Sequence, residues 1–330
     1  MKSYFYFFVF LFACLVSFVN GYGRNSTGRL GQVENSSRNS GIQKNIVEFD
    51  LSYNFSVPGN TRRISLLVVL PETLPDRQKI HQIKCSQKPI RIFETNGNRY
   101  AEFVFINPER RIDIEISVTA ELFRYDFITA SRNNAKNPVK EADLEEFLKE
   151  ETYVEKNNEK IKETAESIEG KNDLEIVQNI YRYVLDNMEY VLHGKKAFGA
   201  VKALRLKKGD CSEYADLFVA LCRARNIPAR VVSGYTVNPD TKTSKHNWVE
   251  VYLQKYGWVP FDPSSGDRAK GIFRDMSFSR MEPVYIYFSY TRNDAVLRNF
   301  SFCSYSYWGD RVRLSDSIEF NQPAFSSRKR

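Results

Sequence analysis

A strict alternation of apolar and polar residues runs from Val47 to Val57 and sets the first constraint on the fold. The apolar members are Val47, Phe49, Leu51, Tyr53, Phe55 and Val57. Successive side chains of a β-strand point to opposite faces of a sheet, so this pattern predicts a strand with one buried face. A second alternation at 112–118 and the apolar run ISLLVVLP predict further strands. We therefore expect residues 46–125 to form a small β-sandwich domain.

The character of the chain changes after residue 125. Residues 141–169 are highly charged and favour helix, which predicts a solvated helical connector over 126–170. The stretch NDLEIVQNIYRYVLDNMEYV then places apolar residues at helical spacing, with Asn172 or Asp173 able to cap the helix. Strand-like segments return in ARVVSGYTV, HNWVEVYLQ and GWVPFDP, and SYSYWGDRVRL is expected to close the same sheet. Residues 171–330 thus predict an α+β domain, with helices packed on an antiparallel sheet.

The N-terminus has the pattern of an export signal. Lys2 precedes an apolar run, and small and polar residues follow, which predicts a signal peptide over 1–21 with cleavage after Gly21. The run is shorter than the roughly 20 residues that span a bilayer; an uncleaved anchor and lipidation at Cys14 are the alternatives. Residues 22–45, rich in Asn, Ser and Gly, predict a flexible linker. We expect an exported protein, periplasmic or extracellular, with no integral membrane span in the mature chain.

Charge and cysteine usage narrow the range of partners. The formal net charge is +8, but the positive residues are scattered and no nucleic-acid-binding motif accompanies them, so no nucleic-acid partner is expected. The cysteines form no Cys-x-x-Cys pair and no His/Cys cluster at metal spacing, so no metal or cofactor is expected. Export would permit a Cys85–Cys303 disulfide, which nothing in the sequence requires.

The segment KKGDCSEYADLFVALC combines a helix start with a cysteine. Asp210 is a favourable N-cap, and Glu213 three residues later completes a capping-box pattern. Cys211 then occupies the first helical position, where the positive end of the helix dipole favours thiolate over thiol. Cys222 lies in the apolar part of the same helix and is expected to be a small buried hydrophobe. Position alone leaves open whether Cys211 is reactive or merely packed.

A thiolate nucleophile needs a base and a group that orients the base. The chain has three histidines. His81 lies in the predicted β domain, and His193 is expected to be a surface residue. His246 opens a strand, and Asp262 follows the partner strand. A three-residue loop, QKY, would place Asp262 opposite Trp248 and on the same face as His246.

These segments resemble a known family. GDCSEYADLFVALCRARNIPARVVSGY followed by HNWVEVYLQKYGWVPFDPSSG closely resembles the catalytic core of the transglutaminase-like superfamily of papain-like cysteine enzymes, from about residue 170 to 266. The β-rich segment before it also resembles the amino-terminal domain of exported bacterial members. Residues 267–330 show no useful resemblance. The implied fold is a papain-like core preceded by a β-sandwich.

The resemblance implies a Cys-His-Asp triad of Cys211, His246 and Asp262. The thiolate would attack a peptide or glutamine-type carbonyl, and the imidazole, oriented by the carboxylate, would protonate the leaving amine. The backbone N–H of Cys211 could stabilise the oxyanion, and the family implies a second donor upstream, for which Tyr190 is the candidate. One departure is Asn247, which stands where a small residue is common.

Three functions fit this reading. The first is a cysteine protease or amidase acting on a peptide or protein substrate, and the second is a protein-glutamine transglutaminase that passes the acyl group to an amine. The third is a catalytically silent scaffold that binds peptides or glycans. Trp248 and Trp258 are candidates for a substrate wall, although aromatic residues in adjacent strands commonly belong to the core. Substrate, acyl acceptor, calcium dependence and oligomeric state do not follow from the sequence.

Overall fold

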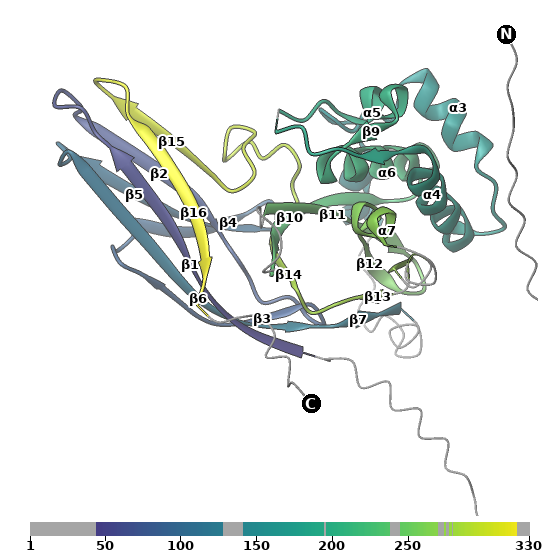
Figure 1. Ribbon diagram of the computed structural model, residues 1–330, viewed down its shortest axis with the longest axis horizontal. Coiled ribbons are helices and arrows are strands. Elements are labelled where there is room, and N and C mark those ends of the chain that lie inside the picture. Colours follow the sequence, from purple (N-terminus) through teal and green to yellow (C-terminus); the bar gives the residue numbers. More distant parts are fainter. Residues whose placement is uncertain are drawn as a thin grey trace, which may run out of the picture. The chain divides into compact units, whose positions relative to one another are not determined.

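A computed structural model describes residues 44–127, 141–194, 196–237, 245–269, 274, 277–278 and 280–321 (Figure 1). The predicted signal peptide and nearly all of the predicted linker lie outside the described residues. No helix in these ranges is long and apolar enough to cross a membrane.

The predicted alternations form one face of a β-sandwich. The first sheet has the order β16-β1-β6-β3, with β1 at Lys44–Ser56, β3 at Gln78–Cys85, β6 at Arg111–Phe123 and β16 at Arg313–Phe320. All four alternating apolar residues of β6, from Ile112 to Val118, are buried, as are the six from Val47 to Val57. The side chains predicted to face the core therefore do so.

The second sheet covers the inner face of the first. Its order is β15-β2-β5-β4, with β2 at Arg63–Leu70, β4 at Arg91–Thr95, β5 at Asn98–Ile106 and β15 at Cys303–Trp308. Strands β15 and β16 were expected to close the sheet of the second domain, and this expectation is wrong: they pair with β2 and β1. Alternating patterns show which residues face a core but do not show which strand they pair with.

The helical half packs on a third sheet of order β12-β11-β10-β14, with β10 at Ala229–Thr236, β11 at Lys245–Leu253, β12 at Gly257–Phe261 and β14 at Tyr285–Ser289. The helices are α3 (Glu159–Ser167), α4 (Asp173–Asn187), α5 (Ala200–Leu206), α6 (Cys211–Ala224) and α7 (Pro263–Arg268), with short turns α2 (Glu141–Leu144) and η1 (Glu145–Leu148). Two-residue strands β7 (Tyr125–Asp126) and β13 (Arg280–Met281) pair with each other, as do β8 (Glu189–Tyr190) and β9 (Lys208–Gly209). The expected α+β class is confirmed.

Helix α4 follows the sequence prediction closely, and the charged connector departs from it. Asn172 caps α4 through the backbone N–H of Glu175, and the apolar stripe of the helix is buried. Within the predicted connector, α3 buries Ile161 and Ala165 against the helical core. The segment is therefore a packed part of the helical half, because its few apolar residues share one face.

The third sheet is also shared with the β-sandwich. Tyr235 and Val237 at the end of β10, together with Ile286 and Phe288 of β14, belong to the sandwich core. Gly234 shows how closely β10 and β14 approach each other within this sheet, since a Cβ at this position would lie 2.0 Å from the Ile286 carbonyl oxygen. The sandwich core therefore extends onto β10 and β14 of the third sheet, while the helical half has a core of its own.

Candidate active site

Helix α6 begins at Cys211 and has the predicted capping box. Asp210 Oδ1 accepts the Ser212 N–H at 2.9 Å, and Glu213 Oε2 accepts the Asp210 N–H at 3.0 Å. A Cβ at residue 209 would lie 2.3 Å from Glu213 Cβ, so only glycine fits before the cap. The cap fixes the sulfur at the first turn, where unpaired helical N–H groups gather.

The hairpin β11–β12 has the register that the sequence predicts. Leu253 pairs with Gly257 across a three-residue loop, and Val249 pairs with Phe261. Continuing this register by one residue places Asp262 opposite Trp248, on the face of His246. Asp262 is also the N-cap of α7, followed by proline at the first helical position, so helix capping fixes its backbone.

The structure brings Cys211, His246 and Asp262 together. The Nε2 atom of His246 lies 2.7 Å from Asp262 Oδ2, and a second side-chain hydrogen bond joins His246 to the Cys211 thiol. Because Nε2 is occupied by the carboxylate, Nδ1 is the nitrogen that remains for the sulfur. The imidazole and the carboxylate are both buried, whereas Cys211 is partly exposed.

Four donors surround the Asp262 carboxylate. Oδ1 accepts the Ser264 hydroxyl and the Ser265 N–H, each at 2.9 Å. Oδ2 accepts the Tyr285 hydroxyl at 2.8 Å in addition to the imidazole. A carboxylate with this many donors is held in its ionised form and in one orientation. It can therefore orient the imidazole and stabilise its positive charge.

The electrostatics of the pair follow from this geometry. Burial alone would lower the pKa of His246, but the Asp262 charge and the hydrogen bonds to Asp262 and Cys211 raise it to about 10. Burial would raise the pKa of Asp262, but the imidazolium, with the Ser265 and Tyr285 hydrogen bonds, lowers it well below its usual range. The pair is therefore a buried imidazolium–carboxylate at neutral pH.

A cavity of about 220 Å³ opens at the sulfur. It is lined by Tyr190, Leu192, Asp210, Cys211, Ser212, Thr236, Lys245, His246, Asn247, Arg268 and Phe302. Arg268 lies over the Tyr190 ring, with its guanidinium carbon 4.9 Å from the ring centroid. Tyr190 therefore lies at the site, as the predicted second oxyanion donor must. Burial raises the pKa of Tyr190, and the nearby charge of Cys211 raises it further.

The two tryptophans do not form a substrate wall. Trp248 is 0% exposed and lies behind His246, with ring centroids 6.1 Å apart and nearly parallel planes, so it supports the imidazole from within the core. Trp258 pairs with Tyr252 near the hairpin loop and stacks on Arg230 at 4.1 Å, and it does not line the cavity. Burial in adjacent strands explains both positions.

Asn247 connects the strand that carries His246 to the helix that carries Cys211. Its Nδ2 donates to Ser212 Oγ at 3.0 Å, and its Oδ1 accepts the Ser233 hydroxyl at 2.8 Å. Asn247 lies on the opposite face of β11 from His246, as its neighbouring position in the strand requires. A side chain that seemed a departure from the family pattern thus links both sides of the site.

One histidine and two carboxylate side chains, those of His193, Asp210 and Glu213, cluster near the start of helix α6. His193 Nε2 lies 2.9 Å from Glu213 Oε2 and 3.4 Å from Asp210 Oδ2, and the His193 side chain is only 15% exposed. The expectation of a surface histidine is therefore wrong, because the loop folds back onto the α6 cap. The same atoms could ligate a metal ion. Glu213 also accepts backbone N–H groups from Asp210 and Phe198, so both of its carboxylate oxygens already have hydrogen-bond donors.

Cys85, Cys222 and Cys303, the other cysteines in the described part of the chain, are free thiols. Cys222 is fully buried, as predicted, and burial raises the pKa of its thiol. Cys85 and Cys303 lie on different sheets and form no disulfide with each other. Burial raises the pKa of Cys303 to about 11, which makes this thiol unreactive at neutral pH.

Comparisons with known proteins agree with this architecture. Residues 162–263 match the profile of the transglutaminase-like superfamily, so the chain contains a domain of that superfamily. An uncharacterised protein of Haemophilus influenzae is 26% identical over 282 residues, covering 74% of this chain and 75% of that protein. A protein-glutamine gamma-glutamyltransferase of Pseudomonas aeruginosa is 36% identical over 67 residues, covering 18% of this chain and 10% of that enzyme.

A solved structure shares the fold over most of the chain. A candidate cysteine protease from Cytophaga hutchinsonii superposes with a TM-score of 0.57, over 86% of this chain and 94% of that one. The two sequences are 19% identical, so the likeness concerns the fold.

Tyr285 is a site residue that sequence reasoning missed, since nothing distinguishes it among 19 tyrosines. We expect Tyr285→Phe to lower the free energy of unfolding at pH 7 by about 1.5–3 kcal/mol, because a hydrogen bond to a buried carboxylate is lost. Denaturant unfolding measures this change. Tyr305→Phe, on an exposed strand, is the control and should have almost no effect. A Tyr285→Phe loss no larger than the control's would contradict the hydrogen bond to Asp262.

Proposed function

We propose that the chain is a thiol enzyme that cleaves peptide or glutamine-type amide bonds through an acyl thioester on Cys211. The observation that supports this is the continuous hydrogen-bonded series from the Cys211 thiol through His246 to the buried Asp262. A nucleophile, a base and a group that orients the base are the three parts that covalent catalysis requires. A partly exposed sulfur at the cavity completes the arrangement.

The proposed reaction has two steps. In the first, the thiolate attacks the carbonyl carbon, the C–N bond breaks, and the imidazolium of His246 donates its proton to the leaving amine. In the second, neutral His246 takes a proton from water, the resulting hydroxide attacks the thioester, and the carboxylic acid leaves as the thiolate returns. Cys211 N–H has no acceptor among the described residues, so it is free to stabilise the oxyanion, with the Tyr190 hydroxyl as the proposed second donor.

Hydrolysis and amine transfer differ only in the second step. The Pseudomonas relative is a gamma-glutamyltransferase and the Cytophaga neighbour a candidate protease, so similarity supports both outcomes. We favour hydrolysis, and the test is a glutamine-containing peptide incubated with and without a primary amine. Hydrolysis predicts either conversion of the glutamine to a glutamate residue with release of ammonia, or a cleaved peptide, with or without the amine. Incorporation of the amine as the main product would establish the transferase instead.

The proposed site of action is outside the cytoplasm. The support is the signal-like segment at residues 1–21, which lies outside the described part of the chain. Fractionation of the producing cells, with detection of the processed N-terminus by mass spectrometry, tests this part of the proposal.

The rate of alkylation of Cys211 by iodoacetamide tests the catalytic proposal without a known substrate. The thiolate is the form that reacts, and an adjacent imidazolium favours it. We expect His246→Ala to slow the alkylation of Cys211 at pH 7 by at least about tenfold, equivalent to about 1.4 kcal/mol. Cys222 is the internal control, because its buried thiol should not react. A rate for Cys211 that is identical in both proteins would leave a silent binding scaffold as the better interpretation.

A further inference from the structure

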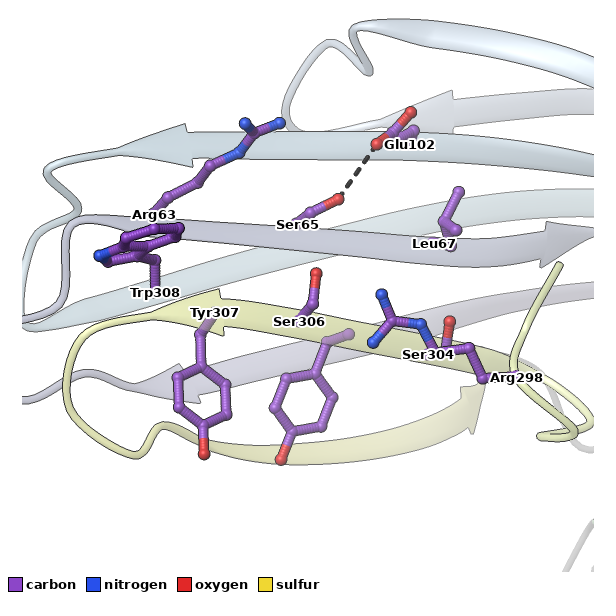
Figure 2. Close-up of a pocket in the computed structure, with 10 residues that line it drawn as sticks. Arg63, Ser65, Leu67, Glu102, Arg298, Ser304, Ser306, Tyr307 and Trp308 are labelled. Carbon is purple, nitrogen blue, oxygen red and sulfur yellow. Dashed lines mark hydrogen bonds between the residues drawn. The ribbon is translucent and has the colours of Figure 1, made fainter.

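A second hollow lies on the outer face of the sheet β15-β2-β5-β4, away from the sandwich core. It has a volume of about 370 Å³ (Figure 2). Its lining consists of Arg63, Ser65, Leu67, Glu102, Arg298, Ser304, Tyr305, Ser306, Tyr307 and Trp308. None of these residues takes part in the proposed reaction, so this hollow needs its own explanation.

Strand register arranges the lining in three rows. Trp308 pairs with Arg63, Ser306 with Ser65, and Ser304 with Leu67, which in turn pairs with Glu102. Opposed side chains on neighbouring strands are in contact, and four residues along a strand span roughly 14 Å. The surface is therefore an elongated platform suited to a short oligomer, with an indole at one end and hydroxyl groups along its length.

The platform carries unbalanced positive charge. The carboxylate of Glu102 is neutralised by Arg91 at 2.5 Å and also accepts the Ser65 hydroxyl at 3.1 Å. Arg63 and Arg298 have no carboxylate within 4.0 Å among the described residues, and Figure 2 shows both guanidinium groups beside the hollow. Unpaired guanidinium groups at a concave surface favour a ligand with carboxylate groups.

The outer face of this sheet exposes two large apolar side chains beside the hollow. Trp308 and Ile106 both pair with Arg63, one on each side of it, so these three side chains lie on the same face. Trp308 is 71% exposed and Ile106 is 64% exposed. Neighbouring exposed apolar side chains on one face, next to a hollow, favour a binding site.

The hydroxyl groups distinguish between two kinds of anionic ligand. Ser304 is only 5% exposed, and its hydroxyl, like that of Ser306, has no hydrogen-bond partner among the described residues. Arginine clusters also bind acidic peptides, so the flat indole and the row of serine hydroxyl groups are the features that favour a sugar. A sugar ring has C–H groups on its faces, which pack on an indole, and hydroxyl groups on its rim, which bond to serines.

We propose that this platform binds an acidic glycan, with a sugar ring on Trp308 and uronate carboxylates on Arg63 and Arg298. The net charge of +8 would favour the approach of such a polymer. The segment that carries Arg298 continues to Phe302, which lines the cavity at Cys211. Four residues span at most roughly 14 Å, so a bound glycan would lie close to the candidate active site. The binding itself does not depend on the proposed function.

Calorimetric titration with oligogalacturonate and with a hyaluronan oligomer tests this proposal. We expect binding that weakens with salt, no binding of neutral maltohexaose, and at least a roughly tenfold loss of affinity in Trp308→Ala and in the double variant R63A/R298A. Ile46→Ala is the control, because Ile46 is an exposed apolar residue on β1 of the other sheet and does not line the hollow. It should leave the affinity within about twofold, and Cys211→Ser should do the same.

Three results would overturn the proposal. The first is a Kd weaker than about 1 mM for both acidic glycans. The second is tighter binding of poly-glutamate than of either glycan, which would identify a peptide site. The third is affinity that is unchanged in Trp308→Ala and R63A/R298A, or reduced as much by Ile46→Ala as by Trp308→Ala. Thermal unfolding of each variant shows whether it is folded, and Trp308→Phe gives a milder change at the same place.

Discussion

Asp262→Asn is expected to lower the rate of amide cleavage by about 10³- to 10⁴-fold, in line with the same change in other Asp-oriented triads. All four partners of the Asp262 carboxylate donate hydrogen bonds. Asparagine has the same shape but only one acceptor oxygen, so its NH₂ group must face at least one pair of donors. The imidazole would lose both its orientation and its counter-charge. Turnover of the glutamine-containing peptide, once measured, gives the rate.

The same variant has a pH signature. The raised pKa of His246, about 10, stabilises the fold fully below its unfolded value of about 6.5, and this stabilisation is lost as pH rises through 10. The lowered pKa of Asp262 stabilises the fold above about pH 4, and this contribution is lost in strong acid. The difference in unfolding free energy between wild type and Asp262→Asn should therefore be largest between about pH 4 and 6.5.

The control for this prediction is Asp113→Asn, which changes an exposed carboxylate on β6. It should leave both the alkylation of Cys211 and the pH dependence of stability as in wild type. If Asp262→Asn behaved like this control, the carboxylate would have no part in orienting His246, and the proposed mechanism would fail.

The geometry of the candidate active site could be predicted because local rules determine most of it. Capping chemistry places Cys211 at the start of a helix, and the loop length of one hairpin sets His246 and Asp262 on the same face. Neither inference needs a contact between distant segments. Such a contact is needed only where helix α6 meets the hairpin β11–β12. There the family resemblance supplied the expectation that Cys211 lies beside His246.

Contacts between distant segments could not be predicted. Gln78 of the β-sandwich is fully buried, and its amide accepts the Tyr287 N–H at 2.8 Å and donates to the Tyr287 carbonyl at 2.9 Å. It thereby pairs with β14 as a neighbouring strand would. Tyr285 of the same strand holds Asp262. The sandwich therefore supports the site from more than 180 residues away in sequence, and a pattern of polar residues contains no signal of such a pairing.

Asp216→Ala is expected to lower the free energy of unfolding by about 3–5 kcal/mol. Asp216 lies on α6, and its carboxylate forms two hydrogen bonds with Arg292, at 2.7 and 2.9 Å. Both side chains are buried. Removing the carboxylate leaves a buried guanidinium without its counter-charge, and this costs more than the ion pair itself contributes. Denaturant unfolding at pH 7 measures the loss.

Two comparisons separate this mechanism from a simple loss of packing. Asp113→Ala breaks the exposed pair with Arg111, whose side chains are 49% and 76% exposed, and should cost less than about 1 kcal/mol. The double variant D216L/R292M removes both charges and should recover most of the stability that Asp216→Ala loses. If the double variant were instead as unstable as the sum of its single changes, volume rather than charge would dominate at this contact. Recovery would show that the segment after β14, which carries Arg292, is held against helix α6 by charge pairing.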